Sequence, residues 1–224
     1  MHACTATYSH NKDCSVFAMP RTAQWRRSWP FFESETMSHH GVATAQFGKA
    51  LTEKLGDRYV VCYDHGDPSK SEKVAACKAF YGTPGEGVHH VNRLADVDVL
   101  VADSDGRALV LIEIEERPSP PKKIVGDIFA LAMSNHVAVG RGDQAYFTIG
   151  AHTQVIIAGM LPEKGAGREK VDTVIKARLS SFHREAYELS LRNVRLLFRE
   201  SLEAALEDAL SSVEEALLEA HSSE

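Results

Sequence analysis

Apolar residues recur along the chain at two spacings, one typical of helices and one typical of strands. In residues 42–55 they return about every 3.6 residues until Gly56, which predicts a helix that ends at this glycine. Residues 58–63 are rich in β-branched and aromatic side chains and predict a strand. The pattern of residues 71–81 predicts a second, short helix.

Two apolar runs, residues 96–101 and 108–115, lie on either side of the pair Asp105-Gly106. An Asp-Gly pair between such runs is a strong signal of a β-hairpin with a two-residue turn. Prolines follow the second run, and Ser119 with the next proline predicts the start of a helix. The sequence therefore predicts a hairpin followed directly by a helix.

The remaining elements alternate in the same way. We expect a strand at residues 154–160, a helix at about 168–189, a strand at 194–199 and a final amphipathic helix capped by Ser201. Helices and strands in this order predict an α/β fold, in which a mixed β-sheet is flanked by helices and an amphipathic helix lies at the C-terminus.

Composition narrows the class of protein. The chain has 224 residues, of which 44% are apolar and 25% charged, as is typical of a globular protein. No stretch approaches the roughly 18 apolar residues of a membrane-spanning helix, and the N-terminus lacks the apolar segment of a secretory signal. We therefore expect a cytoplasmic protein that makes no membrane contact, and the scattered cysteines favour free thiols.

The net negative charge of the chain comes from its C-terminal end. Residues 201–224 contain seven acidic residues and no Lys or Arg, whereas the rest of the chain has 25 basic and 24 acidic residues. We therefore divide the chain into an N-terminal extension or arm at residues 1–36, an α/β domain at 37–200 and an acidic C-terminal helix at 201–224.

Four carboxylates are predicted on one face of the hairpin. A two-residue turn places Asp98 opposite Glu113, and the same register places Asp96 opposite Glu115. A three-residue turn would break this arrangement, and a four-residue turn would keep the side chains on one face but pair Asp96 with Glu113. Opposed like charges weaken a sheet unless a cation lies among them, and Mg²⁺ binds through carboxylates together with substrate phosphates. The pattern therefore predicts a site for Mg²⁺, with Mn²⁺ as an alternative.

The run that begins at Asp98, followed after the hairpin by Leu-Ile-Glu113-Ile-Glu115 and a helix, resembles the core of the PD-(D/E)xK nuclease superfamily. This is the fold of many restriction endonucleases and DNA-repair nucleases, and the order of elements is similar over residues 42–160. The resemblance implies a restriction-endonuclease-like fold with metal ligands at Asp98 and Glu113. It also implies metal-dependent phosphodiester hydrolysis of nucleic acid, with DNA as the preferred substrate, and a homodimer as one open oligomeric state.

The chain departs from the family pattern at Glu115, which replaces the usual Lys and gives an E-x-E variant. Glu115 would then hold the metal or accept the proton of the attacking water. Lys122 or Lys123, at the start of the next helix, is a candidate for the missing positive charge and for substrate binding, and a solvated helix-start lysine is the alternative. The resemblance also makes Glu53 a candidate outer metal ligand, with an exposed helix glutamate as the alternative. Asp96 is a further candidate metal ligand.

Three alternatives stay open from the sequence. A restriction-endonuclease-like domain without turnover would bind nucleic acid or serve a structural role. An enzyme with the same acids would act on a different phosphorylated substrate. Finally, carboxylates on a solvated sheet face would only discourage edge association.

Overall fold

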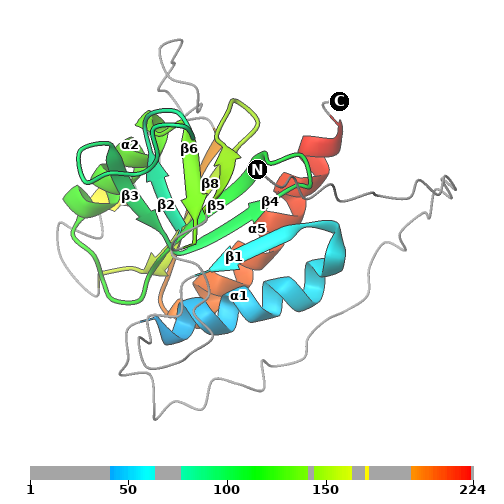
Figure 1. Cartoon of the computed structure of the whole chain (residues 1–224). Helices are drawn as coiled ribbons and strands as arrows, with labels where there is room; N and C mark the ends of the chain where they lie inside the picture. Colours follow the sequence, from blue (N-terminus) through cyan, green and yellow to red (C-terminus); the bar gives the residue numbers. More distant parts are fainter. Residues whose placement is uncertain (1–40, 64–76, 141–143, 163–169, 172–192, 223–224) are drawn as a thin grey trace, which may run out of the picture. The chain divides into compact units, whose positions relative to one another are not determined.

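Two β-sheets and three α-helices form the described part of the chain (Figure 1). The computed structural model describes residues 41–63, 77–140, 144–162, 170–171 and 193–222, all within one unit, Ser34–Glu224. The architecture is mixed α/β, as the sequence predicts. The arm at residues 1–36 and most of the helix expected at 168–189 lie outside the described residues.

The first sheet is mixed, with antiparallel and parallel neighbours. Its five strands are, in spatial order, β1 (Val60–Tyr63), β4 (Val99–Ala102), β5 (Ala108–Glu115), β8 (Gln154–Met160) and β9 (Val194–Arg199). Strands β1, β4 and β5 are antiparallel neighbours, whereas β5, β8 and β9 run parallel. The central strands are almost continuously apolar because both faces of this sheet are buried.

A second sheet has four antiparallel strands, and the sequence pattern did not separate it from the first. In spatial order they are β3 (Arg93–Val97), β2 (Cys77–Phe80), β6 (His136–Val139) and β7 (Ala145–Thr148). The helix expected at residues 71–81 is wrong over its described part, where β2 forms instead. Pairing with β3 and β6 on both sides favours the strand, and Cys77 and Ala79 alternate into the core.

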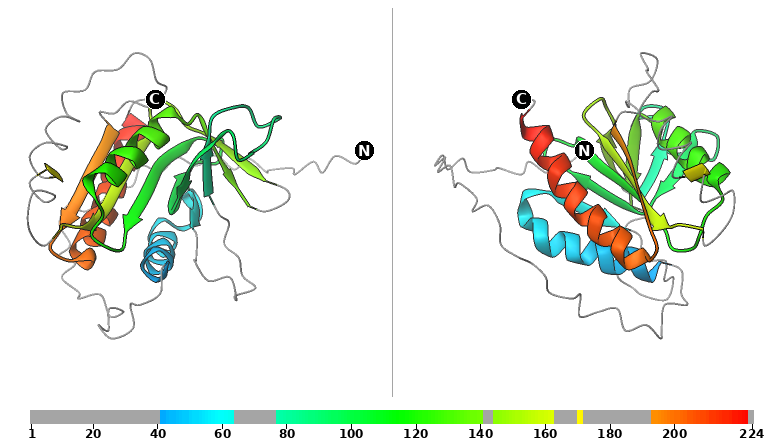
Figure 2. Two further views of the ribbon diagram at one scale, coloured as in Figure 1. Left: turned by 90° about the vertical axis from the view of Figure 1, so that its left-hand side faces the viewer. Right: turned by 180° about the vertical axis from the view of Figure 1, so that it is seen from behind.

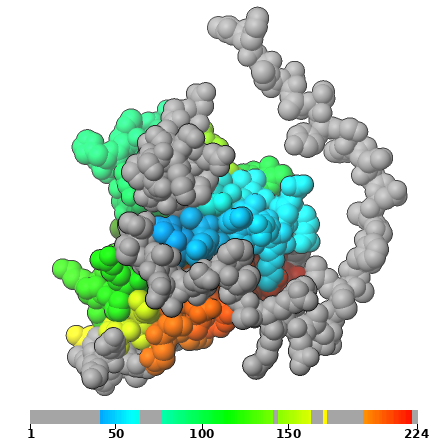
Figure 3. All heavy atoms as spheres, turned by 90° about the horizontal axis from the view of Figure 1, so that it is seen from below, coloured from blue at the N-terminus to red at the C-terminus, as the bar shows by residue number. Residues whose placement is uncertain are grey.

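The first sheet lies between two layers (Figure 2). The helices α1 (Val42–Leu55) and α5 (Leu202–Ser222) cover one face, and Lys54 Nζ on α1 lies 2.9 Å from Glu214 Oε1 on α5. In Figure 3, α1 and β1 appear in blue and cyan at the surface, with the orange of β9 and the start of α5 beside them. None of the helices in the described ranges has the length and apolar character needed to cross a bilayer.

The other face of the first sheet packs on α2 (Pro121–Met133) and on the second sheet. The shared core contains side chains from all three, including Leu111 and Ile157, Ile124, Ile128 and Leu131, and Ala79 and Val137. Leu111 on β5 belongs to this core, and because side chains alternate along a strand, Glu113 and Glu115 face the same layer. The even-numbered residues Ile112 and Ile114 point to the opposite face.

The helices begin and end close to the predicted residues. Helix α1 ends at Gly56, whose φ of 59° lies in the left-handed region that favours glycine, and the short 3-10 helix η1 (Gly56–Arg58) follows. Helix α2 begins directly after Pro120. The Ser201 hydroxyl accepts a 3.2 Å hydrogen bond from the N–H of Ala204 and so caps α5, as expected.

The hairpin between β4 and β5 has the predicted strand register but not the predicted turn. Three residues separate Asp103 from Arg107, and the N–H of Asp103 donates to the Arg107 carbonyl at 3.1 Å. By itself, a three-residue turn would place Glu113 and Glu115 on the opposite face of the sheet from the one predicted. The register shifts at Leu109, which is an extra residue on β5 without a paired residue on β4. Val99 therefore still pairs with Ile112, as predicted.

Replacing two helix glycines by alanine should change stability in opposite directions. A Cβ at Gly48 in α1 would lie 2.2 Å from Cγ of Tyr63, whereas a Cβ at Gly126 in α2 meets nothing within 4 Å. An unhindered helix Gly→Ala change stabilises by about 0.5–1 kcal/mol, and overpacking costs about 1–3 kcal/mol. In thermal unfolding we expect Gly126→Ala to raise Tm by roughly 2–4 °C and Gly48→Ala to lower it. An equal rise in both would contradict the packing of α1 on β1.

Candidate active site

Asp98 lies where the chain passes from the second sheet into the first. It stands between the end of β3 and the start of β4, so the strand expected at residues 96–101 is divided at this residue. Oδ2 of Asp98 accepts a 2.7 Å hydrogen bond from the backbone N–H of Ile114 on β5. This bond holds the Asp98 carboxylate against the strand that carries Glu113 and Glu115.

Glu113 and Glu115 occupy alternate positions near the carboxyl end of β5 and therefore face the same side of the first sheet. Leu111, two residues earlier, belongs to the core that α2 covers. Both glutamates accordingly point toward the layer of α2, which follows β5 in the chain (Figure 1).

The carboxyl group of Glu113 is in an unfavourable environment for a charge. Its Oε1 atom is shielded from solvent and has no hydrogen-bond partner in the described part of the chain. Burial and the nearby charge of Asp98 raise the pKa of Glu113 well above its ordinary value. The charges of Asp127 and Glu115 act in the same direction, and Lys123 opposes them only in part.

Both carboxylate oxygens of Glu115 have protein partners. Oε2 accepts a hydrogen bond from the Ser119 hydroxyl, and Oε1 accepts one from the Lys123 ammonium group. The Glu115 side chain is only 7% exposed, so one partner of this ion pair is buried. The arrangement favours a role for Glu115 in orienting Lys123 over the metal-binding role that the sequence suggests.

Gly159 on β8 provides the space that Glu115 occupies. It lies directly beside Glu115 in the parallel register of β5 and β8. A Cβ at this position would come within 2.7 Å of Cβ of Glu115 and 3.2 Å of Cε1 of Phe198. A side chain here would therefore displace the residue that orients Lys123.

Lys123 brings a positive charge from α2 to the carboxylates. Its Nζ atom donates to Glu115 and lies 3.3 Å from Oδ2 of Asp127, one turn further along the helix. Burial lowers the pKa of Lys123, but the hydrogen bond and charge of Glu115, together with Asp127, outweigh burial and raise it. Burial also raises the pKa of Asp127, which Lys123 opposes. Lys123 is therefore protonated at neutral pH.

Glu116 joins the start of α1 to the same end of β5. Its Oε1 and Oε2 atoms accept hydrogen bonds of 2.9 and 3.0 Å from the backbone N–H of Gly41. A carboxylate near the N-terminus of a helix is stabilised by the positive end of the helix dipole. The first helix is thus attached to the strand that carries the candidate site.

The structure places three other predicted residues differently. The pairing of Asp96 with Glu115 is wrong, because Asp96 lies on β3 of the second sheet, pairs with Lys78 and forms an exposed ion pair with Arg93. Glu53 is exposed on α1, outside the buried face of that helix. Lys122 is exposed on α2, and of the two candidate lysines it is Lys123 that contacts Glu115.

Sequence reasoning missed Ser119, Asp127 and Gly159 as members of this site. Asp127 follows Lys123 at a spacing of four residues, which is a known signal for a helix ion pair. A glycine inside a strand is a signal for close approach by a neighbour, and Gly159 fits it. Ser119 was assigned only to the start of a helix, and its contact with Glu115 depends on the tertiary structure.

Asp98 and Glu113 have the chemistry of a site for a hard divalent cation. Within the described ranges, no three Asp, Glu, His or Cys side chains form a ready-made metal site. Mg²⁺, however, usually binds through one or two carboxylates and completes its coordination with water and substrate phosphate. The solvent-shielded Oε1 of Glu113, to which no donor among the described residues is hydrogen-bonded, fits such a ligand.

No protein-family model, no curated protein and no solved structure matches the chain. The functional argument therefore depends on the geometry and chemistry of these residues.

Glu113→Gln should stabilise the protein in metal-free buffer at pH 7. A carboxyl whose pKa is raised by folding contributes most to stability below its unfolded pKa of about 4.3, and this contribution is lost as the pH rises toward the folded value. Chemical denaturation with EDTA should therefore show a gain for Glu113→Gln at pH 7 that shrinks toward pH 4.

Glu115→Gln is the matched control, because it lies two positions away on the same face but has two protein donors. Removing its charge leaves Lys123 with a weakened partner, so we expect a loss of stability at pH 7. A loss of stability in Glu113→Gln at pH 7 as large as that in Glu115→Gln would contradict the electrostatic description of Glu113.

Proposed function

We propose that the protein is a metal-dependent nuclease that hydrolyses phosphodiester bonds in nucleic acid, with DNA as the preferred substrate. The observation that carries the proposal is the pair Asp98 and Glu113, two carboxylates held together at the end of a buried strand with a lysine in the same cluster. Such a combination suits a reaction in which a divalent cation and a phosphate group share one site. It is the combination that the resemblance to PD-(D/E)xK nucleases implies, with a restriction-endonuclease-like fold.

In this proposal Asp98 and Glu113 hold Mg²⁺ or Mn²⁺. The bound ion would lower the pKa of a water molecule and neutralise charge on the phosphoryl group. The hydrogen bond from Ile114 to Asp98 keeps one ligand in place, and the rigid strand β5 carries the other. Because both ligands are held by β5, one by a hydrogen bond and one as a residue of the strand, metal binding would require little rearrangement of the protein.

Lys123 serves as a positive charge and hydrogen-bond donor toward the phosphate. Its raised pKa excludes it as a proton acceptor at neutral pH. Its side chain is 53% exposed, so the ammonium group is accessible to a substrate while the buried Glu115 carboxylate orients it. A charged donor of this kind stabilises negative charge that develops in the transition state. In this proposal Lys123 supplies the positive charge of the usual family lysine, whose position Glu115 occupies here.

A plasmid-nicking assay with Mg²⁺ and Mn²⁺ tests the proposal. We expect Glu113→Gln to reduce nicking by about 100-fold or more, since it removes a metal ligand. Lys123→Ala should cost on the order of 10²–10³ in rate, as is typical when a stabilising donor is removed. Lys122→Ala, with the same charge change one residue away, should stay within about twofold of the wild type.

The nicking assay, together with separate measurements of nucleic-acid binding, metal binding and RNA cleavage, distinguishes the alternatives. Equal nicking by the wild type and Glu113→Gln would identify a contaminating nuclease and overturn the assignment. Nucleic-acid binding without any metal-dependent cleavage would favour a domain without turnover. Metal binding that depends on Asp98 and Glu113, without cleavage of DNA or RNA, would indicate a different phosphorylated substrate.

A further inference from the structure

The loop formed by residues 81–92, between β2 and β3, exposes an unusual set of side chains. Five large hydrophobic side chains are exposed in the described part of the chain, and two of them, Tyr81 at 64% and Val91 at 79%, belong to this loop. The neighbouring His89, His90 and Arg93 are also exposed. An exposed aromatic ring in a loop that leads to an exposed arginine is typical of single-stranded nucleic-acid contacts.

We propose that the 81–92 loop binds a single-stranded segment of nucleic acid, with an unpaired base stacked on Tyr81 and the backbone near Arg93. This inference rests on the proposed function, because the bound segment would belong to the strand that reaches Asp98 and Glu113. A single strand is the partner of choice because an unpaired base has accessible faces, whereas bases inside a duplex are covered by their neighbours.

The loop is rigid enough to present these side chains in a fixed arrangement. The N–H of Gly82 donates to Oδ1 of Asn135 at 3.0 Å, which ties the loop to the start of β6. Inside the loop, the N–H of His89 donates to Oδ1 of Asn92 at 2.7 Å, and Nδ2 of Asn92 donates to the Gly87 carbonyl at 3.0 Å. A binding surface that is already ordered loses little conformational entropy when a ligand binds.

A second contact fixes the ring of His89. Its Nε2 atom lies 2.7 Å from the carbonyl oxygen of Glu86, and since a carbonyl can only accept, Nε2 carries the proton. The Glu86 carboxylate in turn accepts hydrogen bonds from the N–H and hydroxyl of Thr83. The exposed ring is therefore anchored by the backbone of its own loop.

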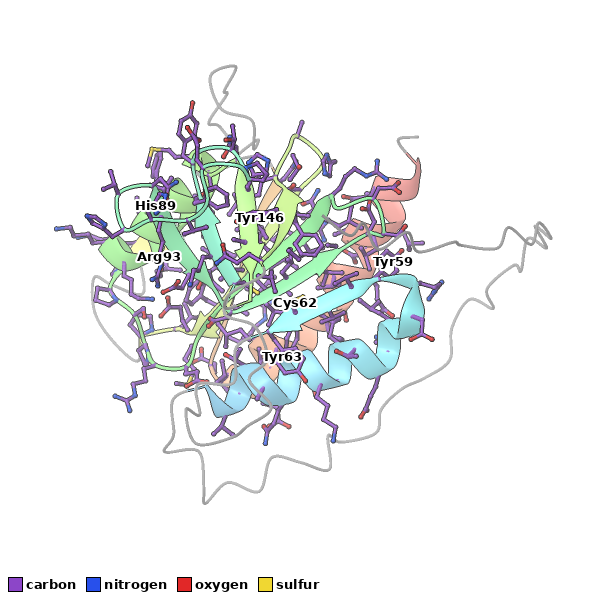
Figure 4. The ribbon with its side chains drawn as sticks, in the orientation of Figure 1. Tyr59, Cys62, Tyr63, His89, Arg93 and Tyr146 are labelled. Atoms are coloured by element: carbon purple, nitrogen blue, oxygen red, sulfur yellow. The ribbon has the colours of Figure 1, made fainter. Side chains whose placement is uncertain are left out.

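Arg93 is positioned to contact a phosphate. It is the first residue of β3 and forms an ion pair with Asp96, in which the side chains are 42% and 62% exposed. An exposed pair of this kind is weak, so a phosphate can take the place of Asp96. The N–H of Arg93 donates to the His89 carbonyl at 3.0 Å, so these two exposed residues lie close together where β3 begins (Figure 4).

Strand β3 leads from this loop to the candidate active site. The N–H of Tyr81 donates to the Asn92 carbonyl, which places Tyr81 beside the beginning of β3, and Asp98 follows the end of this strand. Six residues of extended chain span about 20 Å, or up to about six nucleotides at the spacing of B-form DNA. A strand bound at the loop can therefore continue to Asp98.

Fluorescence anisotropy with a labelled single-stranded oligonucleotide of about 20 nucleotides tests this inference. The protein is the full chain with Glu113→Gln, so that the probe is not cleaved. We expect Tyr81→Ala to weaken binding about tenfold or more, and Tyr81→Phe to restore it, because stacking needs the ring and not the hydroxyl. Met133→Ala, an exposed hydrophobic residue on α2, is the matched control and should bind like the parent.

Salt dependence separates the two kinds of contact. Arg93→Gln should lower the slope of log affinity against log salt concentration by about one, whereas Tyr81→Ala should leave the slope unchanged.

Equal binding by the parent and Tyr81→Ala would overturn this inference, as would an equal loss in Met133→Ala. If Tyr81→Ala binds normally while Glu113→Gln abolishes nicking, the loop assignment fails and the proposed nuclease activity stands. If Tyr81→Ala weakens binding while Glu113→Gln leaves nicking unchanged, the loop assignment stands and the hydrolytic site fails.

Discussion

Placing the Glu113 carboxyl beside Asp98, with its Oε1 atom shielded from solvent, is the constraint on which the candidate site depends. Two like charges in such a place raise the free energy of the folded state unless a proton or a cation offsets them. Lys123 offsets them only in part, since Glu115 and Asp127 share its ammonium group. In our proposal, a divalent cation takes the place of the proton that the raised pKa keeps on Glu113.

The fold brings these groups together through one strand. Strand β5 carries Glu113 and Glu115, pairs with β4 on one side and β8 on the other, and leads into the helix that contributes Lys123 and Asp127. Asp98 joins the cluster because the chain changes sheets at this residue. The glycine at position 159 leaves the room in which Glu115 can orient the lysine.

Most strands of the first sheet and the three described helices could be predicted from the sequence, because strands such as β5 and β8 are long, apolar runs with clear ends. The register that sets Asp98 opposite Glu113 could be predicted for the same reason, although the predicted turn was wrong and an extra residue at Leu109 restored the register. The second sheet was missed because its strands are short and held by tertiary pairing. Asp96 was misplaced with it, and the choice between Lys122 and Lys123 depended on how α2 packs against β5.

Calorimetric titration of the metal-free protein with Mn²⁺ at pH 7 tests most directly whether Asp98 and Glu113 together hold a divalent cation. In two buffers of different ionisation enthalpy, binding should be accompanied by proton release, because the metal displaces the proton that the raised pKa keeps on Glu113. Both the binding heat and the proton release should disappear in Asp98→Asn and in Glu113→Gln. Mn²⁺ binding of equal affinity in all three proteins, or no binding to the wild type, would contradict the assignment.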